Sequence, residues 1–350
     1  MRFGLFGGAR TVVDGRASDS AMYTDYIDYV CEAEKLGFHS LFLVEHHFTG
    51  MGQISASLSF LCYLAAKTTR MRLGAAVVVL PWHNPALLVE QAATLDLLSN
   101  GRFDFGIGRG YRHNEFHGFC IPMEEANERY EEALEFIRKA WSSEGRFSHH
   151  RKRWHFEDVV VEPAPTQKPH PPFWVGVGSR QSIEGAARQG FNILLSQHGS
   201  PAEIGKKVAI YRNAVESEGR IYQPYTIGVT RALHVVMNER ERDEAHELRE
   251  KFLAGVRDLA HDKTAGAKKS GFLKEYSSSD EIRRDTEAEA LIGDPEEIVA
   301  RIREYQAVGV DYMLLMDVSG SPSALRTFGN EVMPQIVSPI AKRRAAGSRG

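Results

Sequence analysis

The chain has 350 residues, of which 43% are hydrophobic and 25% are charged, and its formal net charge is −3. These ordinary globular values give no broad basic surface for nucleic acid, so the expected partner is a small molecule. The length accommodates either one large α/β barrel or two domains, so composition alone leaves the domain count open.

The cysteines and the apolar runs indicate in which cellular compartment the protein is expected. Cys31, Cys62 and Cys120 are odd in number and show no C-x-x-C spacing, so we expect free thiols. The chain starts with a strand-like segment instead of a charged and then apolar leader. Its longest apolar run, 73–81, is far shorter than the roughly 20 residues of a membrane helix. We therefore expect a cytoplasmic protein with no membrane partner.

Short β-branched and aromatic runs alternate with segments of helical period, which is typical of βα units around a parallel sheet. Gly37 and Pro85 stand where a helix should end and begin, respectively. The predicted strands are 2–6, 39–44, 72–80, 102–107, 172–177, 191–196, 225–237 and 311–317. The predicted helices are 21–36, 53–68, 85–98, 124–142, 179–190, 201–218, 295–309 and 322–336. This order predicts an α/β fold, a single (β/α)8 TIM barrel with insertions over residues 1–350.

Two segments interrupt the pattern. Residues 143–171 are rich in His, Arg and Pro and predict a long loop, with a short hairpin around Trp154-His155-Phe156. Between about 256 and 292, lysines, small residues and serines replace the helical period. A mobile lid, a disordered insert and a solvated loop without function are alternatives for this second segment, and we carry the lid forward as the candidate.

The ends of the predicted strands carry the polar residues that matter most, because a barrel of this type has its active site at the C-terminal strand ends. Glu45, His46 and His47 follow the second strand, and His83 follows the third. Neighbouring side chains on a strand point to opposite faces, so His46 and His47 are poorly placed to share one metal ion. No metal site is predicted.

A candidate phosphate site follows the fifth strand. Gly178 leads into Ser179 and Ser182 at a helix start, where free amides, the helix dipole and hydroxyl groups favour an anion. Arg109, after the fourth strand, can add a charge-assisted hydrogen bond. The alternative is that Ser179 only caps its helix. The glycines of 106–110 lack the spacing of a dinucleotide-binding motif.

Several motifs along nearly the whole chain point to one family when they are taken together. They are Phe3-Gly4, Glu45-His46-His47-Phe48-Thr49, Val79-Leu80-Pro81 with Pro85, Gly101-Arg102-Phe103, Phe105-Gly106-Ile107-Gly108-Arg109-Gly110, Gly293-Asp294-Pro295-Glu296-Glu297 and Val332-Met333-Pro334. In these motifs the chain resembles the bacterial-luciferase-like flavin-dependent monooxygenases.

The resemblance implies an enzyme that binds reduced FMN (FMNH2) as a co-substrate from a separate flavin reductase. O2, the second co-substrate, would add to the flavin as a C4a-peroxide, and a small organic substrate would be oxidised. It also implies a homodimer, formed through the helices next to the second and third strands.

By position in these motifs, His46 resembles the catalytic histidine of the family and His47 its neighbour in the active site. Histidine suits this role because it titrates near neutral pH. The remaining carried-over residues would bind the cofactor: Arg109, Ser179 and Ser182, beside Gly178, at its phosphate, and Ala76, Val77 and Gly108 at its ring. The bond between Ala76 and Val77 matches a non-prolyl cis peptide of the family.

One departure concerns Gly108, because luciferase itself has a reactive cysteine at this position. Light emission is therefore not expected, and we expect the glycine to open space for a substrate beside the flavin ring. An F420- or flavin-dependent hydride-transfer oxidoreductase, a metal-dependent TIM-barrel hydrolase and a non-catalytic flavin-binding protein are the alternatives. The Glu-His-His segment favours FMN, and the sequence leaves the substrate open.

Overall fold

The computed structural model describes residues 1–9, 19–49, 54–260, 276, 278–317 and 320–336. Its centre is a ring of parallel strands in the order β10-β12-β1-β2-β3-β5-β8-β9, closed by pairing between β9 and β10. β3 and β4 are two parts of one strand, and both pair with β5. The strands of the ring are β1 (Arg2–Gly7), β2 (Ser40–Leu43), β3 (Arg72–Ala75), β4 (Val78–Val79), β5 (Phe103–Gly108), β8 (Phe173–Val177), β9 (Asn192–Leu195), β10 (Ile227–Val235) and β12 (Tyr312–Asp317). The predicted eight-stranded barrel is confirmed.

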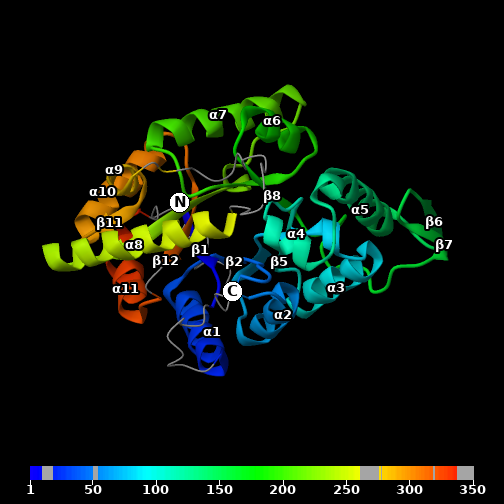
Figure 1. Cartoon of the computed structure of the whole chain (residues 1–350), viewed down its shortest axis with the longest axis horizontal. Coiled ribbons are helices and arrows are strands. Elements are labelled where there is room, and N and C mark those ends of the chain that lie inside the picture. Colours follow the sequence, from blue (N-terminus) through cyan, green and yellow to red (C-terminus); the bar gives the residue numbers. More distant parts are fainter. Residues whose placement is uncertain (10–18, 50–53, 261–275, 277, 318–319, 337–350) are drawn as a thin grey trace, which may run out of the picture.

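Helices surround this ring (Figure 1). Those predicted from the sequence are α1 (Asp19–Leu36), α2 (Ser57–Lys67), α3 (Pro85–Leu98), α5 (Ala126–Ser142), α6 (Arg180–Arg188), α7 (Pro201–Ser217), α10 (Pro295–Ala307), and α11 (Pro322–Thr327), which a π-helical turn joins to α12 (Met333–Ile336). Their ends follow local chemistry: Asn84 caps α3 ahead of Pro85, and Gly37 follows α1 with a φ of 95°.

The segments that interrupt the βα pattern contain both expected and unexpected elements. The expected hairpin is present as β6 (Phe147–His150) and β7 (His155–Val159), and it projects beside α5 (Figure 1). The pattern did not predict α4 (His113–Gly118) or α8 (Glu239–Ala260). Within 256–292 the structure contains α9 (Ser279–Glu289) and β11 (Leu291–Gly293), which pairs with β10. Much of the predicted lid, 261–275 and 277, lies outside the described residues.

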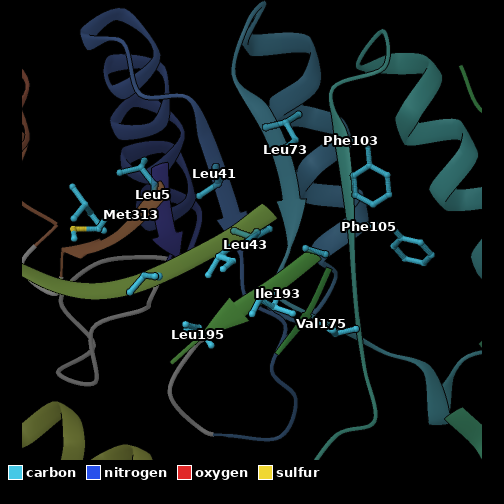
Figure 2. Close-up of a cluster of buried hydrophobic side chains, with 14 of the residues drawn as sticks. Leu5, Leu41, Leu43, Leu73, Phe103, Phe105, Val175, Ile193, Leu195 and Met313 are labelled. Carbon is cyan, nitrogen blue, oxygen red and sulfur yellow. The ribbon is translucent and has the colours of Figure 1, made fainter. Parts of the chain in front are cut away.

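Apolar side chains cover both faces of the barrel strands. Leu41 and Leu43 of β2 join the large core between barrel and helices, whereas Phe42 between them joins a cluster inside the barrel. Figure 2 shows part of the larger cluster, with Leu5, Leu41, Leu73, Phe103 and Val175 on the successive strands β1, β2, β3, β5 and β8. Each fully buried side chain of this size contributes roughly 1.5–3 kcal/mol to stability. Burial on both faces explains the nearly continuous apolar strands of the sequence.

Polar side chains fill the N-terminal end of the barrel interior. Nε and Nη2 of Arg72 each donate to Asp104 at 2.8 Å, and Nε1 of Trp174 donates to Asp104 at 3.1 Å. Ser40 and Tyr312 hydrogen-bond to each other close by in the same layer of strand starts. These residues satisfy one another, which leaves the opposite, C-terminal end of the barrel for a site.

Two glycines of β5 allow the chain between β3 and β4 to approach closely. A Cβ on Gly106 would overlap the carbonyl oxygen of Ala75, and one on Gly108 would lie 2.5 Å from Cγ2 of Val77. The peptide bond between Ala76 and Val77 is cis, as the family resemblance implied. The glycine spacing that superficially suggests a dinucleotide site therefore serves packing between β5 and residues 75–77.

We predict that Gly106→Ala lowers the free energy of unfolding by about 2–3 kcal/mol, because backbone atoms must shift to admit the methyl group. Gly185→Ala is the matched control: its Cβ would meet nothing within 4 Å in the middle of α6. This control should raise stability by about 0.5–1 kcal/mol through helix propensity. Urea unfolding of both variants measures the difference, and equal stability would contradict the packing role of Gly106.

Candidate active site

The predicted site residues lie along one arc of the barrel mouth, at the ends of β2, β3/β4, β5 and β8. Leu43 of β2 pairs with Ala75, Val79 of β4 pairs with Gly108, and Ile107 of β5 pairs with Val175. The residues that follow these strands therefore start from adjacent positions. The arc comprises His46, His47, Ala76, Val77, Gly108, Arg109, Gly178, Ser179 and Ser182.

His46 is held by a carboxylate that the sequence did not indicate. Its Nδ1 lies 3.2 Å from Oε1 of Glu115, a buried residue in the first turn of α4, and the backbone N–H of His47 donates to the same oxygen at 3.1 Å. Since this oxygen accepts hydrogen bonds, we assign the proton of His46 to Nδ1. Its Nε2 is then an acceptor.

The surroundings of His46 set its protonation state. Burial lowers its pKa from the ordinary value, and the Glu115 hydrogen bond, which acts in the opposite direction, does not restore it. The charge of Arg112 also lowers this pKa. The lowered pKa favours the neutral imidazole of His46 at neutral pH, although this side chain is only partly buried.

Glu45 forms a second buried carboxylate site, on the other side of the His46-His47 pair. Its Oε1 lies 3.4 Å from Nε2 of His47 and 3.5 Å from Nε2 of His83, and Ser57 donates to Oε2 at 2.5 Å. Burial alone would raise the pKa of Glu45, but these hydrogen bonds outweigh it and bring the pKa to about 2. Glu45 is thus ionised and orients both histidine rings.

Aromatic rings line the region next to His47. The centroid of the His47 ring lies 4.8 Å from that of Phe119 and 5.8 Å from that of Trp82. Trp82 and Phe119 stack with their planes 24° apart, and Phe116 meets Trp82 edge to face. Trp82 comes from the 3₁₀ turn Leu80–Trp82 after β4, and both phenylalanines come from α4 and its end. This aromatic wall favours an apolar ligand.

The neighbourhood of Gly108 corrects another expectation. Ala76 and Val77 are partly buried and pack against the cluster inside the barrel. The side chain of Val77 occupies the place where a side chain at Gly108 would lie, with Cγ2 2.5 Å from that Cβ position. The glycine therefore makes room for Val77 and opens no space for a substrate beside itself.

At the end of β8, Ser179 and Ser182 form a helix cap. Oγ of Ser179 accepts from the backbone N–H of Ser182, and Oγ of Ser182 accepts from that of Ser179 at 3.1 Å. The capping role of Ser179 is therefore confirmed. Arg109 is exposed, and its Nη1 donates to Asn127 of α5 at 3.0 Å. An exposed guanidinium one strand away from a helix N-terminus is a donor set that fits a phosphate monoester.

A further polar group lies at the end of β9. Nδ1 of His198 is 3.3 Å from Oε2 of Glu289, and Oε1 of the same carboxylate accepts the N–H of Gly199 at 2.7 Å. Glu289 is the last residue of α9, so these contacts fasten α9 to the barrel mouth. His198 lies just after the predicted strand 191–196, and the sequence gave no sign of its partner.

Across the parts of the chain that the structure describes, no group of three or more His, Cys, Asp or Glu residues could hold a metal ion. No helix within the same ranges has both the length and the apolar character needed to cross a membrane.

Curated relatives match most of this chain. It is 28% identical over 361 aligned positions to the oxygenase component of a flavin-dependent trigonelline monooxygenase from Acinetobacter baylyi, covering 99% of this chain and 98% of the relative. It is 29% identical to an FMNH2-dependent dimethylsulfone monooxygenase from Pseudomonas putida, covering 81% and 79%.

Solved structures share the fold. The monooxygenase RslO1 from Streptomyces bottropensis superposes with a TM-score of 0.83 at 25% identity, covering 96% of this chain and 100% of that one. An F420-dependent secondary alcohol dehydrogenase superposes with a TM-score of 0.75 at 16% identity, covering 96% and 99%, which is a likeness of fold alone.

The family comparison decides between the enzyme classes that the sequence left open. The family model described as luciferase-like monooxygenase matches residues 1–312. This match confirms the resemblance seen in the motifs and favours an oxidoreductase over a hydrolase on the same barrel. With its barrel, its strand-end histidines and this match, the chain belongs to the luciferase-like monooxygenase family.

Proposed function

We propose that this chain is the oxygenase component of a two-component monooxygenase that uses reduced FMN and O2 to oxidise a small organic substrate. The observation that carries the proposal is His46, a neutral imidazole held by the buried Glu115 at the C-terminal end of the barrel. The relatives described as flavin-dependent and FMNH2-dependent support the cofactor, and the words "oxygenase component" support a separate flavin reductase.

The residues that would hold the flavin span the arc described above. Arg109, the start of α6 with its Ser179–Ser182 cap, and Gly178 would hold the phosphate, and Ala76, Val77 and Gly108 would border the ring. The bound reduced flavin would supply the electrons that activate O2. The protein would then have to exclude water and handle a proton, and the buried residues near His46 suit both tasks.

His46 and its neighbours would have different roles in proton transfer and in shaping the site. Nε2 of His46, free as an acceptor, would take or return a proton, while Glu115 fixes the ring through Nδ1. His47, oriented by Glu45, would shape the site together with the aromatic wall. We also propose that the chain forms a single domain in which α9, within the predicted lid of 256–292, covers part of the site; the contacts of Glu289 with His198 and Gly199 support this.

The cofactor is tested first, by anaerobic titration of the purified chain with reduced FMN, oxidised FMN and F420. Reduced FMN should bind more tightly than either other cofactor. Oxygen uptake with a flavin reductase and a panel of substrates then separates a monooxygenase from a non-catalytic flavin-binding protein. Tight binding of F420 with no binding of reduced FMN would instead support hydride transfer.

We predict that His46→Ala lowers the rate of substrate oxidation by about 10²–10⁴-fold and raises the fraction of O2 released as hydrogen peroxide. Glu115→Gln, which removes the charge but keeps an oxygen acceptor beside the ring, should have a smaller effect. His117→Ala is the control, since His117 is exposed on the same helix. Product and peroxide are quantified in parallel, and unchanged coupling in His46→Ala would exclude a proton-transfer role.

We predict that Arg109→Gln weakens binding of reduced FMN by about 10–100-fold, because one charge-assisted hydrogen bond is lost. Riboflavin, which has no phosphate, should bind the variant and the parent protein equally. Arg188→Gln is the control, since this arginine is exposed at the opposite end of α6. If riboflavin binding fell as much as FMN binding, Arg109 would not be a phosphate ligand.

A homodimer is also part of the proposal. The helices next to the second and third strands, α2 and α3, expose large apolar side chains: Tyr63, Leu87, Leu97 and Leu98, between 44% and 60% exposed. Apolar surface gathered on two adjacent helices is typical of an interface.

We also propose that the protein is cytoplasmic. The free thiols of all three cysteines fit the reducing environment of the cytoplasm.

We predict that the double substitution Leu87→Glu and Leu98→Glu converts the dimer into a monomer, because it places charge in the apolar interface. Ile221→Glu is the control: Ile221 is 84% exposed and lies outside α2 and α3. Light scattering coupled to size-exclusion chromatography gives the mass of each variant. A monomeric parent protein, or a dimer that survives the double substitution, would contradict this interface.

A further inference from the structure

Arg112 is a buried arginine whose guanidinium lies 5.8 Å from the centroid of the Tyr111 ring and lacks hydrogen-bond partners for two of its nitrogens among the described residues. It precedes α4 and is only 3% exposed. Its Nε and Nη1 atoms are buried and have no hydrogen-bond partner among the residues that the structure describes. By contrast, Arg72 pairs with Asp104, and the fully buried Arg231 donates to Ser196, Gly199 and Tyr305.

Such an arrangement destabilises the ligand-free protein. A guanidinium group stays charged at physiological pH, and moving it out of water without a partner costs free energy. Buried polar groups in native proteins are almost always paired, and exceptions commonly belong to functional sites. The unpaired nitrogens of Arg112 therefore indicate a ligand that supplies the missing acceptors.

The surroundings of Arg112 place this ligand next to the candidate catalytic histidine. Arg112 lies close enough to His46 for its charge to act on the imidazole. Asn114, two residues further on, donates to the carbonyl oxygen of His47, while its own Oδ1 is buried without a partner among the described residues. Nε1 of Trp82, in the aromatic wall, is likewise buried and unpaired within the described ranges.

The two arginines after β5 face different partners. Arg109 hydrogen-bonds to Asn127 of α5, and its strand neighbours β8, which leads into α6. The segment of Arg112 instead packs on the residues after β2, through contacts of Glu115 with His46 and of Asn114 with His47. A phosphate held by Arg109 and α6 would leave Arg112 free for a second anion.

We propose that Arg112 binds the carboxylate of an organic acid substrate and holds its apolar body against the aromatic wall beside His46. A guanidinium suits this task, because it offers two parallel hydrogen bonds to a carboxylate. The aromatic rings of Trp82 and Phe119 provide the apolar contact. This assignment names a substrate class for the proposed monooxygenase and rests on that proposed function.

The test uses benzoate as the anionic probe and benzamide as its neutral counterpart of the same shape. Isothermal titration of the full chain, with and without reduced FMN, measures both dissociation constants. The parent protein should bind benzoate at least about tenfold more tightly than benzamide, which corresponds to roughly 1.4 kcal/mol. Arg112→Met should abolish this preference, and Arg112→Lys should retain part of it.

The melting temperature shows whether Arg112→Met loses benzoate binding because the variant no longer folds. Arg112→Met should leave the melting temperature of the ligand-free protein unchanged or raise it, because an unpaired buried charge is removed. Arg72→Met, the matched control, should lower the melting temperature, because it leaves the buried Asp104 without its ion pair. A large loss of stability in Arg112→Met would mean that Arg112 is a structural residue and would overturn the proposal.

The remaining outcomes separate this inference from the proposed function. Arg109→Met should weaken FMN binding and keep the preference for benzoate. The inference fails if the parent protein binds no benzoate, if Arg112→Met keeps the preference, or if Arg112→Met weakens only FMN binding. Reduced FMN binding and O2 consumption by the parent protein would leave the proposed function intact in each of these cases.

Discussion

The close approach of residues 75–77 to β5 is the constraint on which the site depends. Gly106 and Gly108 carry no side chain, so the chain between β3 and β4 can approach β5 closely, and Val77 packs against the cluster inside the barrel. The turn after β4 then carries His83 to Glu45 and Trp82 to His47. Larger residues in β5 would push this segment outwards and separate the groups around the two histidines.

Two buried carboxylates give the adjacent histidines different environments. Successive side chains of an extended segment point in opposite directions, which makes His46 and His47 poor partners for one metal ion. The same geometry gives each histidine its own acid, Glu115 for His46 and Glu45 for His47. A partly buried, neutral His46 can act on a proton, while the ionised Glu45 fixes His47 in place.

The two ends of the barrel differ in how completely their buried polar groups are hydrogen-bonded. At the N-terminal end, Arg72, Asp104 and Trp174 satisfy one another's hydrogen bonds. At the C-terminal end, Arg112 and Trp82 keep buried donors unpaired among the described residues. Unpaired donors reduce stability, and proteins retain them where a ligand completes the hydrogen bonds. This contrast fits a luciferase-like monooxygenase that must hold both a flavin and a substrate at one mouth.

The sequence by itself determined the elements and the strand ends. Hydrophobic period and turn residues predicted the eight strands of the ring, and the polar residues after them, His46 among them, identified the mouth of the barrel. Only the tertiary structure decided that Glu115 holds His46, that burial keeps this imidazole neutral, and that Val77 fills the place beside Gly108. Helix α4, which supplies Glu115, has six residues and is too short to show a period. Its contacts join positions 69 residues apart, and such contacts depend on packing that no local pattern encodes.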